Sequence, residues 1–347
     1  MIKVKKEGII LEKSSYRFEN TGVLNPAIIR ENETVHMFYR ALGEGNYSSI
    51  GHCTIKNQLT VENRLEIPIL YQQYEYEKQG LEDPRIVKID DLYYLTYTAF
   101  DGTNALGALA VSKDLINWEK RGLIVPQYSY QEFKLLAESR GELSEKYFRF
   151  NGEYTVPKKN GKKVLVWDKN VILFPRRING KLYFLHRIKP DIQIIAVNDI
   201  SELTHNYWDY ILLRFTDYIL ISPKYEHEVS YVGGGCPPIE TEKGWLLIYH
   251  GVHDTIKGYL YCACAALLAL DNPRHEIARL PYPLFKPEYE YEINGITDNI
   301  CFPSGSLIID DKLYIYYGAS DEHIACASIS LTELLNELLL NTIPDEK

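Results

Sequence analysis

The chain has 347 residues, of which 46% are hydrophobic and 24% charged, and its formal net charge is −9 at pH 7. This length and composition are ordinary for a globular protein with a large core. The acidic balance, without a basic tract of five or more residues, argues against a nucleic-acid or anionic-membrane partner.

The N-terminal segment is basic but lacks the apolar core and the small-residue cleavage site of a signal peptide. No apolar run approaches the roughly 20 residues that a membrane span needs. We therefore expect a cytoplasmic protein with no membrane association. The six cysteines are scattered except for Cys262 and Cys264, and the nine histidines lack ligand spacing, which predicts reduced thiols and no metal site.

A strand–turn–strand pattern recurs five times along the chain. Each copy has a small or polar residue, a proline, an apolar strand, a turn, and a second strand rich in Tyr and Leu. The prolines are separated by 58, 91, 62 and 66 residues and are Pro26, Pro84, Pro175, Pro237 and Pro303. A β-unit repeated at near-constant spacing predicts an all-β fold, a five-bladed β-propeller that forms a single domain over residues 1–347.

Two segments depart from the repeat. Residues 127–160 account for the long second spacing, and their helix-forming composition predicts an inserted helical segment that is either a lid or a subunit contact of a homo-oligomer. Residues 330–342 contain a capping-box pattern, Ser330 with Glu333, followed by apolar positions at helical spacing. They predict a short C-terminal helix on the outside of the domain.

The sharpest local motif runs from Gly80 to Arg85 and contains adjacent carboxylates at Glu82 and Asp83. Because proline follows, we expect Asp83 to be extended, so that Glu82 faces the opposite side and Arg85 the same side. One carboxylate would then point into the mouth of the ring beside a fixed cation. The alternative is a surface turn with a weak local ion pair.

Polar residues end the second strand of each copy, and in a propeller such equivalent ends meet at one mouth. These residues are Arg40, Asp101, Arg187, His250 and Asp321. Lys169 and Asn170 open the third copy, so that with Arg187 and His250 they could hold an anion such as phosphate. Carboxylate, amide and guanidinium groups at Asn25, Arg40, Asp101 and Asp321 suit sugar hydroxyls. The alternative is that solvent or main-chain carbonyls satisfy each group separately.

The motifs, in order, resemble those of glycoside hydrolase family 130. They are N-P-A…Y-R-A, E-D-P-R, K-N-x-x-L-F-P…L-H-R, G-G-G-x-P-P…Y-H-G and F-P-x-G…Y-Y-G-A-x-D, and they cover residues about 20–328. The resemblance implies a five-bladed propeller and a glycosyltransferase of the β-mannoside phosphorylase type, which forms α-mannose 1-phosphate with inversion. Some members of the family are β-mannosidases instead.

The resemblance also implies residue roles. Asp83 matches the family's general acid, whose proton is thought to pass through a hydroxyl of the bound mannose. Asn25, Arg40 and Asp321 match positions that hold the mannosyl unit, and we assign Glu82, Arg85 and Asp101 to the sugar site as well. Arg187 and His250 match phosphate-binding positions. Lys169 departs from the Arg of several phosphorylases, although Asn170 follows it as in the family.

Three functions remain open from the sequence. An inverting hydrolase needs an acid and a base, whereas phosphate is already an anionic nucleophile. One acid opposite a Lys/Arg/His cluster therefore favours phosphorolysis of a β-mannoside oligosaccharide, with inorganic phosphate as co-substrate and no cofactor. A β-mannosidase would need a second carboxylate facing Asp83, for which Glu240 and Asp254 are candidates. A non-catalytic glycan-binding propeller would not need Asp83.

Overall fold

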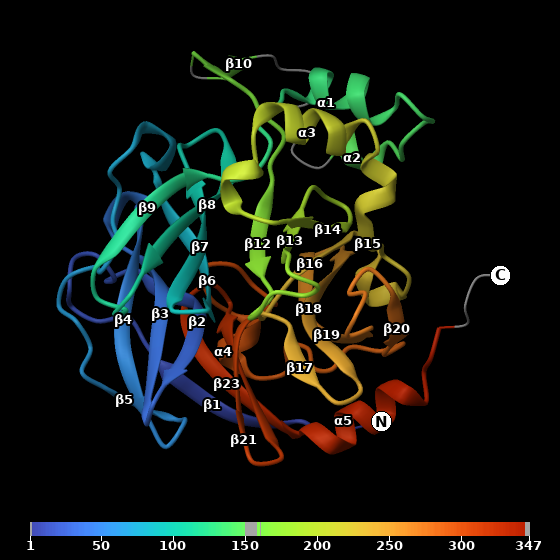
Figure 1. Ribbon diagram of the computed structural model, residues 1–347. Coiled ribbons are helices and arrows are strands. Elements are labelled where there is room, and N and C mark those ends of the chain that lie inside the picture. Colours follow the sequence, from blue (N-terminus) through green and yellow to red (C-terminus); the bar gives the residue numbers. More distant parts are fainter. Residues whose placement is uncertain (1, 150–157, 160, 344–347) are drawn as a thin grey trace.

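The computed structural model describes residues 2–149, 158–159 and 161–343. β-Strands are the main secondary structure of this chain, and they are arranged in antiparallel groups that follow one another along the sequence (Figure 1). In the described part of the chain, no helix has the length and apolar content that crossing a bilayer requires.

The first two groups form one eight-stranded sheet. The first contains β2 (Gly22–Glu31), β3 (Thr34–Leu42), β4 (Ser48–Lys56) and β5 (Thr60–Glu62). The second contains β6 (Gly80–Ile89), β7 (Leu92–Phe100), β8 (Ala105–Ser112) and β9 (Trp118–Leu123). A single parallel pairing, Ser48 with Gly80, joins the groups.

The other three groups form separate sheets. The third contains β12 (Lys169–Leu173), β13 (Leu182–Arg187), β14 (Ile192–Val197) and β15 (Ile219–Ile221). The fourth contains β16 (Tyr231–Gly234), β17 (Ile239–Thr241), β18 (Gly244–Thr255), β19 (Gly258–Leu268) and β20 (Glu276–Arg279). The fifth contains β21 (Cys301–Ile309), β22 (Lys312–Ala319), β23 (His323–Ser330) and β1 (Lys5–Leu11). The first strand of the chain therefore pairs with the last.

Five hydrophobic clusters lie between these groups. One combines buried side chains of the first and second groups, and the next three combine the second with the third, the third with the fourth and the fourth with the fifth. The last combines the fifth group with the first. The order of packing is therefore cyclic. The predicted β-rich fold is confirmed. No described sheet closes on itself, and the five blades therefore stay a prediction.

Short helices fill the connections. They are α1 (Tyr130–Ala137), α2 (Lys146–Arg149), α3 (His205–Leu212), α4 (Glu290–Ile293) and α5 (Leu331–Leu339), with 3-10 turns η1 (Glu44–Asn46), η2 (Glu75–Glu77), η3 (Ile200–Glu202), η4 (Phe215–Tyr218) and η5 (Glu226–Glu228). A two-residue hairpin pairs β10 (Lys158–Lys159) with β11 (Lys162–Lys163). Figure 1 shows α1, α2 and α3 together at one end of the molecule.

Helices α1 and α2 occupy the segment where the sequence predicts an insertion, of which residues 150–157 and 160 lie outside the described residues. Phe133 of α1 packs its ring against Tyr147 of α2 and Phe215 of η4. Helix α5 lies within the predicted 330–342. Ser330 caps it by accepting the N–H of Glu333, and Asp311 accepts the N–H of Thr332.

A second repeat supports the fold, and the sequence analysis missed it. The pattern Tyr-x-(aromatic or His)-Glu occurs at residues 16–19, 74–77, 225–228 and 289–292. In each copy the two rings stack within 13° of parallel. Each glutamate is fully buried and accepts a hydrogen bond from a strand tyrosine, and these are Tyr39, Tyr97, Tyr249 and Tyr317. A basic side chain completes each cluster: Arg64, Lys120, Arg279 and Lys6.

Candidate active site

A β-bulge recurs at the start of the first three groups and sets three polar side chains in equivalent positions. The strand register shifts at Asn25, Asp83 and Asn170. Their φ angles are 51°, 52° and 53°, in the left-handed region that Asn and Asp tolerate better than most residues. The prediction that Asp83 is extended is therefore wrong, because the bulge sets its conformation despite the proline that follows.

The strand residues opposite the first and third bulges are cations. Leu24, just before the first bulge, pairs with Arg40, and Lys169, just before the third, pairs with Arg187. In the fourth group Gly233 pairs with His250. By the same register Thr98 and Gly318 are the equivalents of Arg40, so Asp101 and Asp321 lie three residues beyond it.

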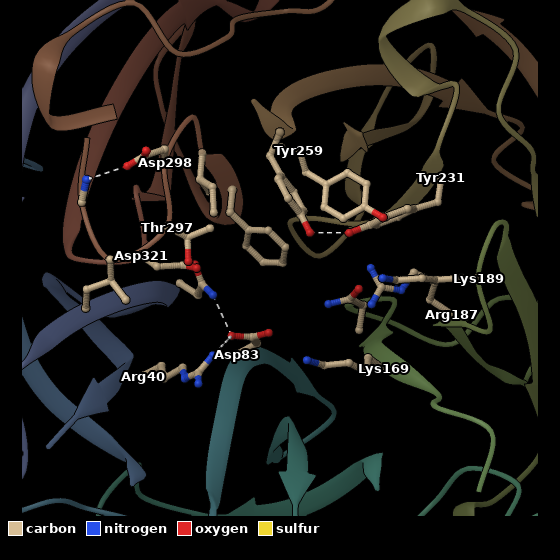
Figure 2. A pocket seen from close by; sticks show the side chains of 18 of the residues that line it. Arg40, Asp83, Lys169, Arg187, Lys189, Tyr231, Tyr259, Thr297, Asp298 and Asp321 are labelled. Atoms are coloured by element: carbon tan, nitrogen blue, oxygen red, sulfur yellow. Dashed lines mark hydrogen bonds and ion pairs between the residues drawn. The ribbon is translucent and has the colours of Figure 1, made fainter. Parts of the chain in front are cut away.

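The bulges face a cavity of about 670 Å³. It is lined by seven of the predicted site residues, namely Asn25, Arg40, Asp83, Lys169, Asn170, Arg187 and Asp321. Figure 2 shows Asp83 in the middle, with Arg40 and Asp321 on one side and Lys169, Arg187 and Lys189 on the other. The structure therefore brings together residues that are up to 296 positions apart in the chain, from Asn25 to Asp321.

Asp83 lies in a dense hydrogen-bonded network. Asn25 donates to its Oδ1 at 2.6 Å, and Arg40 Nη1 lies 3.6 Å from the same oxygen. Glu82 shares the cation, because Arg40 Nη2 lies 2.8 Å from its Oε1, and it also pairs with Lys169 Nζ at 3.2 Å. The two adjacent carboxylates thus meet the same guanidinium. The prediction that they face opposite sides of a strand is wrong, again because of the bulge.

Charge controls the protonation of Asp83. Burial raises the pKa of this carboxyl, but Lys169, Arg40 and Arg85, together with the hydrogen bond from Asn25, outweigh burial and hold the pKa below its usual value. Lys169 is the strongest of these cations. The carboxyl is therefore ionised at neutral pH in the ligand-free pocket. A group bound at Lys169 with negative charge would raise the pKa of Asp83 again.

Arg85 and Asp101 do not line the cavity. Arg85 is 2% exposed and donates to the main-chain carbonyls of Asp83, Pro84 and Gly235, so it holds the bulge in place from behind. Asp101 accepts the N–H groups of Thr103 and Asn104 and pairs with Lys162 at 3.0 Å. These contacts give both residues a supporting place in the structure, away from any sugar in the cavity.

Asp321 lines the cavity with a different electrostatic balance. Burial raises the pKa of its carboxyl, and the negative charges of Asp83 and Glu82 add to that effect against the opposing charge of Arg40. Its φ of 54° turns the residue out of the strand direction. A half-buried carboxylate near Arg40 is a suitable acceptor for a sugar hydroxyl.

The cationic side of the cavity has a member that the sequence analysis missed. Lys189 lines the cavity near Arg187, with its Nζ 3.9 Å from the centre of the Tyr231 ring. His250 is fully buried behind Arg187, and its Nε2 lies 3.4 Å from Arg187 Nη1. Burial and the surrounding cations hold the pKa of His250 well below its usual value, so the neutral ring accepts from the guanidinium. It therefore acts on the cavity through Arg187.

Aromatic side chains form much of the remaining wall, and the sequence did not single them out. They are Trp167, Tyr231, Tyr259, Tyr261 and Phe302. Tyr231 and Tyr261 share a hydrogen bond between their hydroxyls. With 28 tyrosines in the chain, only the three-dimensional arrangement distinguishes those at the cavity from those that pack within sheets.

One group of side chains among the described residues has the spacing of a metal site, His227, Glu228 and Cys264. Glu228 already accepts from the Tyr249 hydroxyl and pairs with Arg279. Burial also holds the pKa of the Cys264 thiol well above its usual value, which disfavours the thiolate that metals bind. The arrangement fits the buried glutamate clusters of the fold better than a metal centre.

Comparison with known proteins decides the family. The family model described as beta-1,4-mannooligosaccharide phosphorylase (Glyco_hydro_130) matches residues 5–339. The chain belongs to glycoside hydrolase family 130. A 1,2-beta-oligomannan phosphorylase of Thermoanaerobacter sp. (strain X514) is 32% identical over 96% of this chain and 99% of its own length. A beta-1,2-mannobiose phosphorylase of Listeria innocua serovar 6a is 29% identical over 94% of this chain and 79% of its own.

Solved structures of family 130 share the fold. The beta-1,2-mannobiose phosphorylase from Listeria innocua, in complex with beta-1,2-mannobiose, superposes with a TM-score of 0.74 at 23% identity, covering 98% of this chain and 100% of that one. A second structure, from work on family 130 glycoside hydrolases that target beta-1,2 mannosidic linkages, has a TM-score of 0.68 at 21% identity, over 95% of this chain and 94% of that one. These similarities support the β-rich architecture of the family 130 chain.

The carboxylates considered for a hydrolase lie elsewhere. Glu240 pairs with Arg176 through both carboxylate oxygens, and 45% of its side chain is exposed. Asp254 is exposed and accepts from the Ser230 hydroxyl. Neither lines the cavity. The carboxylates that do so alongside Asp83 are Asp298 and Asp321.

Proposed function

We propose that this protein is an inverting β-mannoside phosphorylase that converts a β-mannoside and phosphate to α-mannose 1-phosphate and a shortened acceptor. The observation that carries the proposal is the pairing, in one cavity, of Asp83 with the cations Lys169 and Arg187, next to the amine of Lys189. Burial and the charges of Arg187 and Lys169 hold the pKa of Lys189 well below its usual value, and a bound anion would raise it. Phosphate needs such cations because the chain as a whole is acidic.

The reaction follows from this arrangement. A phosphate oxygen held by Lys169, Arg187 and Lys189 attacks the anomeric carbon of the mannosyl unit and forms the new C–O bond. The glycosidic C–O bond breaks on the opposite face, which inverts the configuration. Asp83 supplies the proton that the leaving oxygen takes up, relayed by a hydroxyl of the mannose. Asn25, Arg40 and Asp321 hold the mannosyl hydroxyls during the displacement.

The charges explain how an ionised aspartate becomes an acid. Lys169 contributes most among the cations that lower the pKa of Asp83. Phosphate bound at Lys169 offsets this positive charge, so the pKa of Asp83 rises when the nucleophile is in place. Protonation of Asp83 is then coupled to phosphate binding, and water attack without phosphate is disfavoured.

We propose β-1,2-linked mannosides as the first substrates to test. The relatives named for β-1,2 activity cover 94–96% of this chain. The beta-1,4-mannooligosaccharide phosphorylase of Ruminococcus albus matches 48% of the chain at 33% identity. Because the alignments with the β-1,2 relatives cover more of this chain, we favour a β-1,2 linkage in the substrate, although the family model is described by a β-1,4 activity.

We also propose that the five antiparallel groups are the blades of one five-bladed propeller. The cyclic order of the hydrophobic clusters and the pairing of β1 with β23 support it. The site then lies where the bulged ends of neighbouring blades meet. A five-bladed arrangement accounts for the convergence of Asn25, Asp83 and Asn170 from equivalent positions.

The test is incubation with β-1,2- and β-1,4-mannobiose, each with and without phosphate, followed by product analysis. We expect α-mannose 1-phosphate and free mannose from one linkage, only when phosphate is present. Full cleavage without phosphate would instead support a β-mannosidase, with Asp321 or Asp298 as the second carboxylate. No cleavage with any β-mannoside, together with measurable glycan binding, would support a non-catalytic function.

A further inference from the structure

The third group departs from the buried cluster that the other four groups share. In these four groups a tyrosine of the second strand lies just before the residue that pairs with the start of the first strand. The tyrosines are Tyr39, Tyr97, Tyr249 and Tyr317. In the third group His186 has the same position, just before Arg187. Each tyrosine donates to a glutamate from a preceding loop. In the third group His186 Nδ1 lies 2.7 Å from Asp168 Oδ2, and Asp168 directly precedes Lys169.

Asp168 forms hydrogen bonds with two consecutive residues of β13, His186 and Arg187. Its Oδ2 accepts from His186, and its Oδ1 accepts the main-chain N–H of Arg187 at 3.2 Å. Main-chain bonds to Ala105 and Gly107 fix Asp168 itself to β8. Asp168 and His186 are 0% and 1% exposed. One buried carboxylate thus ties the strand that carries Lys169 to the strand that carries Arg187.

The partners of Asp168 differ from those of the four glutamates. Each glutamate pairs with a Lys or Arg that does not line the cavity, which offsets the charge of the glutamate locally. Among the described residues, His186 is the one Lys, Arg or His whose side-chain nitrogen lies within 4.0 Å of an Asp168 carboxylate oxygen. His186 Nε2 has no hydrogen-bond partner among the described residues, so the hydrogen bond of Nδ1 to Asp168 is the one that orients the ring. Unlike the four glutamates, Asp168 therefore has no Lys or Arg partner among the described residues, and its hydrogen bonds go to His186 and to the main chain of Arg187.

We propose that the buried Asp168–His186 pair is a positioning device for the anion site, which holds Lys169 and Arg187 at the separation that an oxyanion such as phosphate requires. The inference rests on the proposed phosphorylase function for its physiological anion. The five groups can be compared directly. In four of them the equivalent tyrosine belongs to a buried cluster with a glutamate and a Lys or Arg. The third group has the Asp168–His186 pair instead, and it also carries the cationic wall of the cavity, which consists of Lys169, Arg187 and Lys189.

The experiment compares His186→Leu, which removes the donor, with His186→Asn, whose amide can take the place of Nδ1. Phosphate affinity is measured by titration calorimetry, and the KM values for phosphate and mannobiose are measured separately. We expect His186→Leu to weaken phosphate binding and raise the phosphate KM roughly tenfold, the scale of one hydrogen bond to a charged group. The mannobiose KM should stay within about twofold, and His186→Asn should recover most of the phosphate affinity.

Other outcomes separate the hypotheses. An unchanged phosphate affinity in His186→Leu overturns the positioning role. So does an equal loss for both substrates in the Leu and Asn variants with equally lowered melting temperatures, because that pattern is purely structural. If wild-type protein cleaves mannobiose without phosphate, the proposed function fails, whereas the calorimetric comparison still decides whether the pair positions the anion site. Wild-type protein that binds no phosphate would overturn both.

Discussion

Buried carboxylates occur in two regions of this molecule, and their surroundings differ. Glu77, at the end of the 3-10 turn η2, accepts from the Tyr97 hydroxyl, pairs with Lys120 at 2.6 Å and accepts the N–H groups of Gln73 and Tyr74. Asp83 has Asn25 and Arg40 on one oxygen and faces a cavity. The first carboxylate is saturated by the protein, whereas the second keeps capacity for a ligand. The same chemistry thus stabilises the fold in one place and serves function in the other.

The largest expected effect is on the cavity carboxylate. Asp83→Asn keeps the acceptor for Asn25 but cannot donate the proton, so we expect turnover to fall by about 10²–10⁴-fold, as for loss of a general acid. Thermal stability should fall at neutral pH, because the amide loses the attraction of the cations that hold the pKa of Asp83 below its usual value, so the rate is measured well below the melting temperature of the variant. The measurement is the initial rate of sugar phosphate formation with saturating phosphate.

Asp101→Asn is the matched control, because Asp101 lies outside the cavity and binds main-chain N–H groups. It should keep most of its turnover. Near-normal activity in Asp83→Asn would transfer the acid role to another group, with Glu82 the next to test.

The saturated carboxylate should show the opposite pattern. Glu77→Gln leaves the Lys120 ammonium, whose side chain is 2% exposed, without its countercharge. Breaking a buried pair in this way costs roughly 3–5 kcal/mol of stability. We expect a loss on that scale in urea unfolding, with turnover retained well below the melting temperature.

Glu119→Gln provides the control for this effect. Glu119 pairs with Arg121 in solvent, and the two side chains are 67% and 50% exposed. Its removal should cost less than about 1 kcal/mol. Equal losses for the two variants would show that the buried cluster contributes no more than a surface pair.

The sequence predicted the repeat and seven of the residues that line the cavity, because both depend on local patterns. The proline, the turn and the Tyr/Leu strand recur at near-constant spacing. The register then places Arg40 and Arg187 at equivalent positions of the second strand, with Asn25 and Asn170 at equivalent positions of the first. The bulge at Asp83 could not be predicted from the sequence. A proline favours an extended conformation in the residue before it, whereas the register shift depends on how the two strands pair. Lys189 was missed because it lies beyond the strand end, outside the repeat pattern.

An effect of intermediate size, on the phosphate KM, is expected from replacing a cation of the cavity. Arg187→Ala removes a charge-assisted donor that is worth about 1.5–3 kcal/mol, so the phosphate KM should rise about ten- to a hundredfold with little change for mannobiose. Lys169→Arg should keep activity, because it preserves the charge and matches the residue expected from the family resemblance. The measurement is initial rate against phosphate concentration. A rise in the mannobiose KM alone would assign Arg187 to the sugar instead.

The smallest expected effect is the change in melting temperature on replacing Asp321, and its sign distinguishes a functional carboxylate from a saturated one such as Glu77. Burial and the neighbouring carboxylates raise the pKa of Asp321 above its ordinary value of 3.8, so ionising it costs folding free energy. That cost is absent at pH values below 3.8, where folded and unfolded states both hold the proton, and is fully present above the raised pKa. Asp321→Asn should therefore raise the melting temperature at pH 7, and its advantage should shrink as the pH falls towards 4.

The same substitution should weaken mannoside binding, because the amide replaces a charged acceptor for sugar hydroxyls in the cavity. A gain in stability with a loss of binding is the pattern expected for a residue kept for function. It is the reverse of that expected for Glu77→Gln, which loses stability and keeps activity. Melting curves from pH 4 to 8 for wild type and the two variants provide the comparison. If Asp321→Asn melts lower than wild type at pH 7, then Asp321 belongs with the saturated carboxylates, and its interaction with Arg40 outweighs its burial.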